Sequence, residues 1–235
     1  MALALEHIPD IIVSDIMMPR MNGIELTRIL KEDIRTSHIP IILLTAKVTD
    51  ADKEEGYESG ADSYLTKPFT AKLLGSRIQN LLAARRRMIE RLANQLGPAS
   101  TSPNDPATSS TPGTEQTASS ETSALSPLDQ QFFERLNKII EDNIMQEDLD
   151  MAFVSDRMAM SHSTFYRKVK ALTGMTANEY VRKRRLRYCY GLLESGEYNV
   201  SQAAMMTGFN QMAHFRETFK REFGILPSEV LKKKA

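Results

Sequence analysis

Tryptophan is absent from this chain of 235 residues, and cysteine occurs once, at Cys189. A single cysteine cannot close an internal disulfide, which excludes the disulfide-stapled class of secreted proteins and favours the reducing cytoplasm. Apolar runs are also short, since none approaches the roughly 20 residues that a membrane-spanning helix needs. The segment Met1–His7 is too short and not basic enough for a signal peptide. We therefore expect a cytoplasmic protein with no membrane partner, and we expect Cys189 to be buried on a helix.

Net charge is lacking as well, because 30 basic residues balance 30 acidic ones, but the charges are unevenly distributed. From Arg157 to the C-terminus there are 15 Lys and Arg residues against 6 Asp and Glu, whereas residues 128–156 carry 2 against 8. A basic block of this kind is typical of a surface that binds phosphate groups. Basic runs also arise as ordinary solvated helix faces, so charge alone leaves both interpretations open.

Large apolar residues are scarce between residues 97 and 127, where Ser, Thr, Pro, Ala, Gly and Gln dominate. Such a segment cannot bury enough surface to offset the entropy that ordering would cost. We interpret it as a disordered linker that divides the chain into residues 1–96 and 128–235. A linker of this length argues against rigid coupling of the two parts.

The first part alternates strand and helix patterns. Short apolar runs at 10–15, 39–45 and 61–66 are typical of buried parallel strands. Helical patterns follow them at 24–32, at 49–59 and after Thr70, which can cap the last helix. This alternation predicts an α/β domain with a partial, doubly wound parallel sheet.

The second part has no strand pattern, and its apolar positions recur at three and four residues, as in helices. It also contains an internal repeat, because Phe165 and Gly174 recur 50 residues later as Phe215 and Gly224. In each copy a helix ends at a glycine suited to a left-handed cap, and a shorter helix and a tight turn precede it. This is the helix-turn-helix pattern. We therefore expect an all-helical domain with two such motifs.

Two stretches carry a family resemblance. They are Ser161-(x)3-Phe165-Tyr-Arg167-(x)2-Lys170-Ala-Leu-Thr-Gly174 and Val200-Ser-Gln-Ala-Ala-(x)3-Gly208-Phe209-(x)5-Phe215-(x)3-Phe219-Lys220-(x)3-Gly224-(x)2-Pro227. Residues 128–235 resemble the AraC-type DNA-binding domain of bacterial transcription regulators. The resemblance implies that the longer helix of each motif enters a major groove of promoter DNA.

Core packing of Phe165 and Phe215 leaves an outward-facing set of residues on each of these helices. The residues expected to contact DNA are His162, Ser163, Tyr166, Arg167, Lys170, Gln211, Met212, His214, Arg216 and Lys220. Alternatives stay open: Met212 fits core packing equally well, and the histidines and arginines fit ordinary surface positions. A basic cluster on the helix between the motifs is expected to touch phosphates or to pair with the acidic first helix. Its members are Arg182, Lys183, Arg184, Arg185 and Arg187.

The first part carries a second set of motifs. They are Ser14-Asp15-Ile-Met-Met-Pro19, Met21-Asn-Gly23, Thr45-Ala46, Gly60-Ala61-Asp62 and Tyr64-Leu-Thr-Lys67-Pro68-Phe69. Residues 1–90 thereby resemble the later part of a response-regulator receiver domain. The resemblance implies that Asp15 accepts a phosphoryl group and that Thr45 and Lys67 contact that group. It implies further that Tyr64 is the switch aromatic and that the Lys67–Pro68 peptide is cis.

An intact receiver begins with a strand-helix-strand unit that supplies an acidic pair for Mg²⁺. Roughly 40 residues of this doubly wound pattern do not precede Asp15 here. The resemblance therefore predicts a truncated receiver in which Asp15 remains from an incomplete metal site. We expect no cofactor in this chain, although Mg²⁺ is expected for an intact receiver.

The resulting interpretation is a two-component response regulator that acts as a sequence-specific transcription regulator, not as an enzyme. Its expected partners are double-stranded promoter DNA, a sensor histidine kinase, RNA polymerase and, in a homodimer, a second copy. Two alternatives remain. The chain is the output end of a hybrid sensor kinase, or it is a constitutive DNA-binding module with a vestigial receiver.

Overall fold

Three short apolar runs form a parallel sheet with the strand order β1–β2–β3. The computed structural model describes residues 2–46, 58–95, 125–146 and 149–232. The strands are β1 (Ile12–Asp15), β2 (Ile41–Thr45) and β3 (Ser63–Thr66). The partial parallel α/β sheet predicted from the sequence is therefore confirmed.

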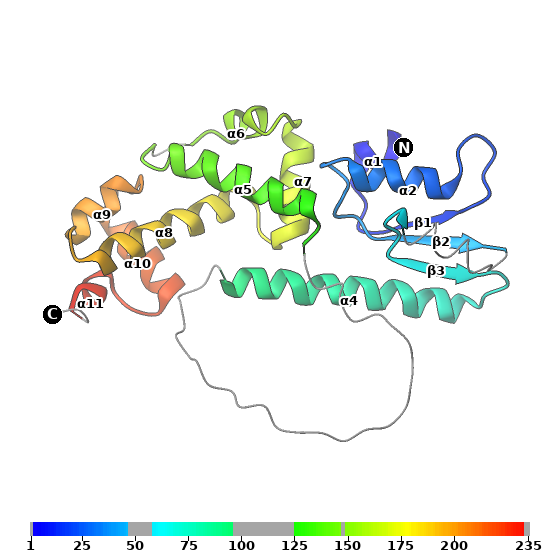
Figure 1. Ribbon diagram of the computed structural model, residues 1–235. Helices are drawn as coiled ribbons and strands as arrows, with labels where there is room; N and C mark the ends of the chain where they lie inside the picture. Colours follow the sequence, from blue (N-terminus) through cyan, green and yellow to red (C-terminus); the bar gives the residue numbers. More distant parts are fainter. Residues whose placement is uncertain (1, 47–57, 96–124, 147–148, 233–235) are drawn as a thin grey trace, which may run out of the picture.

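Helices cover this sheet (Figure 1). They are α1 (Ala2–His7), α2 (Gly23–Glu32) and the long α4 (Ala71–Gln95). Thr70 caps α4, since its hydroxyl accepts a hydrogen bond of 3.2 Å from the Leu73 N–H. The helix predicted at 49–59 lies almost entirely outside the described residues. One hydrophobic cluster of this unit buries Ile24, Leu30, Ile41, Leu43 and Ala61, and Ile8, Ile39, Ile42 and Leu65 are buried outside that cluster.

The second unit is all helical, as predicted. Its helices are α5 (Pro127–Asp142), α6 (Met151–Arg157), α7 (His162–Thr173), α8 (Ala177–Ser195), α9 (Val200–Met206), α10 (Met212–Phe223) and α11 (Pro227–Lys232). Helix α5 begins one residue before the predicted domain start, with Ser126 as its N-cap. Most of the predicted linker, up to residue 124, lies outside the described residues.

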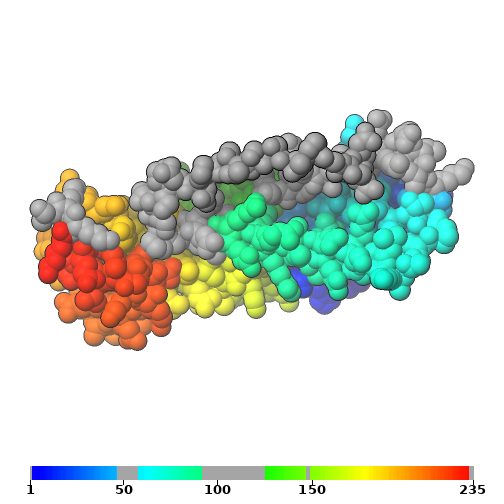
Figure 2. All heavy atoms as spheres, turned by 90° about the horizontal axis from the view of Figure 1, so that it is seen from below, coloured from blue at the N-terminus to red at the C-terminus, as the bar shows by residue number. Residues whose placement is uncertain are grey.

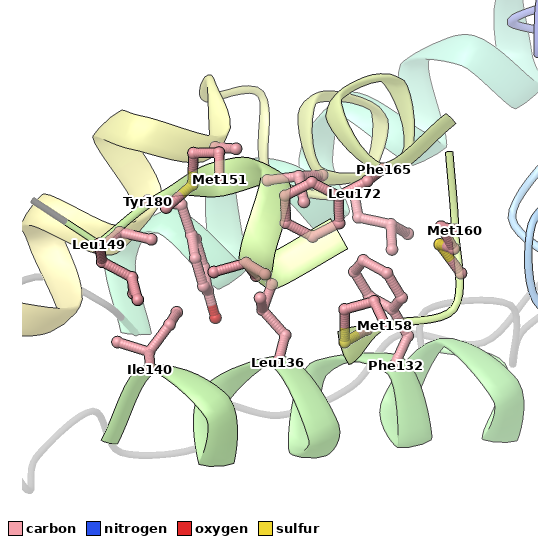
Figure 3. Close-up of a cluster of buried hydrophobic side chains, with 14 residues drawn as sticks. Phe132, Leu136, Ile140, Leu149, Met151, Met158, Met160, Phe165, Leu172 and Tyr180 are labelled. Carbon is pink, nitrogen blue, oxygen red and sulfur yellow. The ribbon is translucent and has the colours of Figure 1, made fainter. Parts of the chain in front are cut away.

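Two separate cores hold this unit together. In the first, Phe132, Leu136 and Ile140 of α5 point toward Phe165 of α7 and Tyr180 of α8 (Figure 3). The second core packs the rest of α8 against α9, α10 and α11 around the contacting rings of Phe215, Phe219 and Phe223. The long helix α8 contributes to both cores, so it joins the two halves of the unit.

Cys189 lies on α8 in the second core and is fully buried, as predicted. Burial raises the pKa of its thiol to about 12, against the opposing effect of a hydrogen bond with Thr207.

The α/β unit and the helical unit pack against each other in one elongated molecule (Figure 2). Helix α4 runs beneath the sheet and reaches α7, which it contacts (Figure 1). Ile34, which follows α2, packs against the first core of the helical unit. This arrangement differs from the loose coupling that the long linker led us to expect, because Ile34, Ser37 and Arg85 of the first unit contact the helices of the second.

Among the helices in the described ranges, none joins sufficient length to sufficient apolar character to cross a lipid bilayer.

Candidate functional site

Asp15 and Lys67 come from different strands and meet at one edge of the sheet. Asp15 is the last residue of β1, and Lys67 follows the last residue of β3. Parallel strands place their carboxyl ends at the same edge, which is where open α/β sheets bind ligands. The Lys67 ammonium forms an ion pair with Oδ2 of Asp15. Thr45 ends the intervening strand, and its carbonyl accepts a hydrogen bond of 2.7 Å from the Lys67 backbone N–H.

The Asp15–Lys67 pair is open to solvent, because the two side chains are 35% and 41% exposed. The hydrogen bond from Lys67 holds the pKa of the Asp15 carboxyl below its ordinary value, and burial opposes this effect. The backbone N–H of Met17, 3.3 Å from Oδ1, also lowers this pKa. Asp15 is therefore an ionised and reachable oxygen nucleophile beside a cation.

Gly23 allows α2 to begin directly against the end of β1. A Cβ atom at this position would lie 2.2 Å from the carbonyl oxygen of Asp15. The Gly23 N–H donates a hydrogen bond of 2.9 Å to the Ile16 carbonyl, which fixes the loop that carries Asp15. Asn22 caps the helix by accepting a hydrogen bond of 3.0 Å from the Ile24 N–H. The Asn-Gly pair therefore positions the phosphoryl-acceptor candidate.

The remaining receiver residues lie near this edge. Tyr64 lies on β3, is half-buried and packs against the small core. The Lys67–Pro68 peptide is cis, which confirms that expectation. In the described part of the chain, no group of three or more His, Cys, Asp or Glu side chains gathers to hold a metal ion. A single carboxylate does not fit the octahedral oxygen shell of Mg²⁺, so we assign no step to that ion.

The two helix-turn-helix motifs repeat in detail. Helices α6 and α9 each have 7 residues, and α7 and α10 each have 12. Helices α7 and α10 end at Gly174 and Gly224, with left-handed φ angles of 71° and 73°. In both copies the glycine N–H donates a hydrogen bond of 2.8 Å to a lysine carbonyl four residues earlier, at Lys170 and Lys220. The sequence repeat is therefore a repeat of backbone geometry.

Most of the predicted DNA-contacting residues lie on the exposed faces of α7 and α10. The exposed ones are His162, Ser163, Arg167, Lys170, Gln211, His214, Arg216 and Lys220. Two others are half-buried. Met212 packs against the second core, and Tyr166 packs against the first core, with its ring centroid 4.4 Å from that of His162. For Met212 the structure thus favours the core alternative.

The basic cluster on α8 is divided among different environments. Arg184 pairs with Glu141 of α5 at 2.7 Å, and Lys183 pairs with Glu222 of α10 at 2.9 Å. Arg185 is buried and donates a hydrogen bond to the Gln146 carbonyl. Arg182 is exposed. Together with Gln211, the N-cap residue of α10, it lines a surface pocket. Arg182 is therefore the member of this cluster that is best placed to meet a phosphate group.

Sequence reasoning missed Lys168, which is fully buried on α7. Its ammonium lies 2.6 Å from Oδ1 of Asp129 and 3.0 Å from the Ser37 hydroxyl, and it donates a hydrogen bond to the Ile34 carbonyl. Helical spacing could have predicted that Lys168 is buried, because position 168 lies three residues after Phe165 and four before Leu172, on the buried helix face. Its partners were not predictable, since they are distant in sequence.

Comparisons with known families agree with both halves of the structure. Residues 1–79 match the family model of the response regulator receiver domain. Residues 154–233 match the model of a helix-turn-helix domain.

Similar proteins include both kinases and regulators. A protein named histidine kinase P4 from Formosa agariphila is 37% identical over 227 residues, which is 97% of this chain and 15% of that protein. The phosphate regulon transcriptional regulatory protein PhoB of Pseudomonas aeruginosa is 47% identical over 81 residues, 34% of this chain and 35% of its own. The chain thus spans well under half the length of these relatives. A solved transcriptional regulator with an AraC-type domain, from Chromobacterium violaceum, is 24% identical, with a TM-score of 0.42 over 46% of this chain and 95% of that one.

The matched segments, the sheet edge with its Asp15–Lys67 pair and the repeated helical motifs agree on one assignment. The chain joins a receiver domain to an AraC-type helix-turn-helix domain, and it is homologous to the C-terminal part of a hybrid histidine kinase.

Proposed function

We propose that this chain is a transcription regulator that binds promoter DNA in a sequence-specific way and is controlled by phosphorylation of Asp15. The observation that carries the DNA-binding part is the paired geometry of α6–α7 and α9–α10. Two helices of equal length each present an exposed polar face, and a single helix of this kind fits the width of a major groove. Two such motifs on one rigid domain suit successive major-groove segments on one side of the duplex.

Roles within the interface follow from side-chain chemistry. Arg167 and Arg216 carry planar guanidinium groups, which recognise guanine edges with two hydrogen bonds. Lys170, Lys220 and Arg182 are exposed cations suited to phosphate oxygens, which position the protein without reading sequence. Regulation of transcription then requires contact with RNA polymerase, and a homodimer would occupy paired sites. This function places the chain in the cytoplasm.

Control through Asp15 follows from its chemistry. An Oδ atom of the Asp15 carboxylate attacks the phosphorus of a phosphohistidine on a sensor histidine kinase. The new O–P bond forms as the N–P bond breaks, and the bonding electron pair returns to the imidazole nitrogen. Lys67 stabilises negative charge on the transferred group as a point charge, and the Thr45 side chain is the proposed hydrogen-bond donor to one of its oxygens.

The DNA-binding part is tested by selecting duplexes from a randomised pool with the full chain at near-physiological salt. An enriched motif with two half-elements about one helical turn apart is expected. Arg216→Ala should lose about 1–3 kcal/mol of affinity and relax the preference at one position. Arg221→Ala is the matched control, because it removes an exposed arginine from the far turn of the same helix. Retention of DNA without any enriched motif would contradict sequence-specific binding.

The phosphorylation part is tested by labelling the full chain with a phosphorylated histidine kinase or with acetyl phosphate. Asp15→Asn should abolish an acid-stable, hydroxylamine-sensitive acyl phosphate. Asp10→Asn, at an exposed carboxylate just before β1, should leave the labelling unchanged. Absence of label on the unmodified chain would favour a constitutive DNA-binding module with a vestigial receiver.

A second candidate is the output end of a hybrid sensor kinase. The match to histidine kinase P4 over 97% of this chain favours it. In that case the phosphoryl donor belongs to the same polypeptide, and the catalytic activity resides in segments outside these residues. Sequencing the transcript upstream of the Met1 codon distinguishes the two, since an open frame that encodes a kinase would support the second.

A further inference from the structure

The receiver and the DNA-binding domain meet around a buried cation. Lys168 of α7 is fully buried, and its ammonium is bound from both sides of the domain boundary. On the side of the DNA-binding domain, Oδ1 of Asp129 on α5 accepts a hydrogen bond of 2.6 Å from the Lys168 ammonium. On the receiver side, the Ser37 hydroxyl and the Ile34 carbonyl each accept a hydrogen bond from the same ammonium. The Ser37 hydroxyl also donates a hydrogen bond of 2.8 Å to Asp129, so three side chains close one polar cluster.

More contacts extend this junction along α7. Arg85 of α4 donates hydrogen bonds to the Ala171 carbonyl at 3.3 Å and to the Asp10 carbonyl of the receiver at 3.2 Å. Ile89 of α4 lies against Gly174, where an added Cβ would meet its side chain at 3.0 Å. At the opposite end of the domain contact, Arg167 donates a hydrogen bond to the Glu6 carbonyl of α1. The receiver therefore holds one flank of α7 from its middle to its C-terminal cap.

The held flank lies directly beside the proposed reading face. Residues 168 and 171 face the receiver, and the exposed residues 163, 167 and 170 occupy the neighbouring strip of the helix. A helix with side chains is about 10–12 Å wide, and the major groove is about 12 Å wide. A helix inserted in that groove has phosphate walls on both flanks, so no room remains for a protein domain.

We propose that the docked receiver is an autoinhibitory contact that closes the first recognition helix, so that docking and DNA binding exclude each other. This inference rests on the proposed function, since it takes α7 as a DNA-reading helix. Opening the contact leaves the Lys168–Asp129 pair intact within the DNA-binding domain, and it releases the receiver-side hydrogen bonds together with the apolar contacts of Ile34 and Ile89. The two states therefore differ by this limited set of contacts, as a switchable equilibrium requires.

The test uses the full chain and the duplex selected above. Ser37→Arg places a cation against Lys168 and should open the contact from the receiver side, away from Asp15 and from every proposed DNA contact. Ser76→Arg adds the same charge at an exposed serine of α4 and is the matched control for non-specific attraction to DNA. If about one molecule in ten is open in the unmodified chain, Ser37→Arg should bind about tenfold more tightly.

A second pair of variants tests the same contact independently, in case Ser37→Arg does not fold. Arg85→Glu removes the hydrogen bonds to Ala171 and Asp10, and Arg86→Glu makes the same charge change at an exposed neighbour. Arg85→Glu should bind DNA more tightly than Arg86→Glu. Hydrogen exchange of residues 33–40 in the unmodified chain should also become faster when saturating duplex is added.

Equal affinities within both variant pairs, with sequence-specific binding intact, would overturn the autoinhibitory contact and leave the proposed function standing. Unchanged exchange of residues 33–40 upon addition of DNA would overturn it as well. Failure of every variant and of the unmodified chain to select a motif would instead contradict the proposed function, and the inference would fall with it.

Discussion

At the scale of single residues, Lys168 and Asp129 form an ion pair that is buried from solvent. The Lys168 side chain is 0% exposed and that of Asp129 is 4% exposed, so neither charge is hydrated. Burial lowers the pKa of Lys168, and the nearby Asp129 carboxylate opposes that shift. The ammonium also lies 5.1 Å from the centroid of the Phe132 ring, which offers a further favourable contact for a cation.

Removing one partner of this pair should be costly because it leaves an uncompensated buried charge. Asp129→Ala is expected to lower the free energy of unfolding by about 3–5 kcal/mol, measured by urea denaturation. The double variant Asp129→Leu with Lys168→Met should recover much of this loss, since both charges are then absent. Asp142→Ala on the exposed end of the same helix is the control and should have little effect. An equal loss in the single and double variants would show that the charges contribute little.

His38 is a second unusual residue beside the domain contact. Both of its ring nitrogens are buried without a hydrogen-bond partner. Burial, and then the positive charges of Lys168, Arg85 and Lys31, hold the pKa of this imidazole well below its ordinary value of 6.5. These cations come from α7, α4 and α2, three different helices.

Stability should therefore depend on pH below neutrality. A histidine whose pKa is lowered on folding contributes stability that is fully present above the unfolded value and is lost as pH falls below it. We expect the free energy of unfolding to fall between about pH 6.5 and pH 5, by up to about 1.4 kcal/mol for each pH unit. His38→Phe should flatten this profile, whereas His162→Phe, at an exposed position, should keep it. Superimposable profiles for all three proteins would rule out His38 as the source.

At the scale of elements, helices α7 and α10 have the same cap but different surroundings. Gly174 and Gly224 both adopt left-handed φ angles, which cost an alanine about 1–2 kcal/mol. A Cβ at Gly224 would meet nothing within 4 Å, whereas one at Gly174 would meet Ile89 of α4 at 3.0 Å. Any difference in the stability lost on substitution at the two positions should therefore come from the contact with α4.

Alanine at the two caps should accordingly destabilise the protein unequally. Gly224→Ala should cost about 1–2 kcal/mol through backbone strain, and Gly174→Ala should cost more because of the Ile89 contact. Thermal or urea unfolding measures both. Adding Ile89→Ala to Gly174→Ala should remove the excess, and an excess that persists in that background would assign it to another cause.

These elements were largely predictable from the sequence because each depends on local patterns. Apolar runs indicated the strands, the Phe and Gly repeat indicated both motifs, and the resemblance to receiver domains implied that Thr45 and Lys67 lie near Asp15. Core packing of Met212 was one of two alternatives that those patterns left open, whereas neither the half-buried position of Tyr166 nor the domain contact followed from them. The contact depends on Ser37 and Lys168, which are 131 residues apart, and no local periodicity encodes such a pairing.

At the scale of the whole molecule, the receiver has little core of its own. Its described residues include nine buried apolar residues, against 24 in the DNA-binding domain, and none of the residues 71–91 of the long helix α4 is buried. A unit with so little buried apolar surface is marginally stable by itself. Packing of Ile34 and Arg85 against the DNA-binding domain therefore adds stability that the receiver otherwise lacks.

Calorimetry of the full chain should reveal this dependence. Ser37→Arg is expected to lower the melting temperature of the receiver and to leave the DNA-binding domain near its original transition, because that domain retains both of its cores. Ser76→Arg should resemble the unmodified chain. A uniform shift of all transitions with Ser37→Arg would mean that the two domains unfold as a single unit whatever the state of their contact.

The burial of Cys189 has a practical consequence for measuring how the receiver separates from the DNA-binding domain. Its thiol is fully buried and resists ionisation, so it should not react with maleimides or nitroxide reagents while the protein is folded. A fluorophore or spin label can therefore be attached at a cysteine introduced on each domain without first replacing the native one. Distances between two such labels would follow the opening of the receiver directly, in the otherwise unaltered protein.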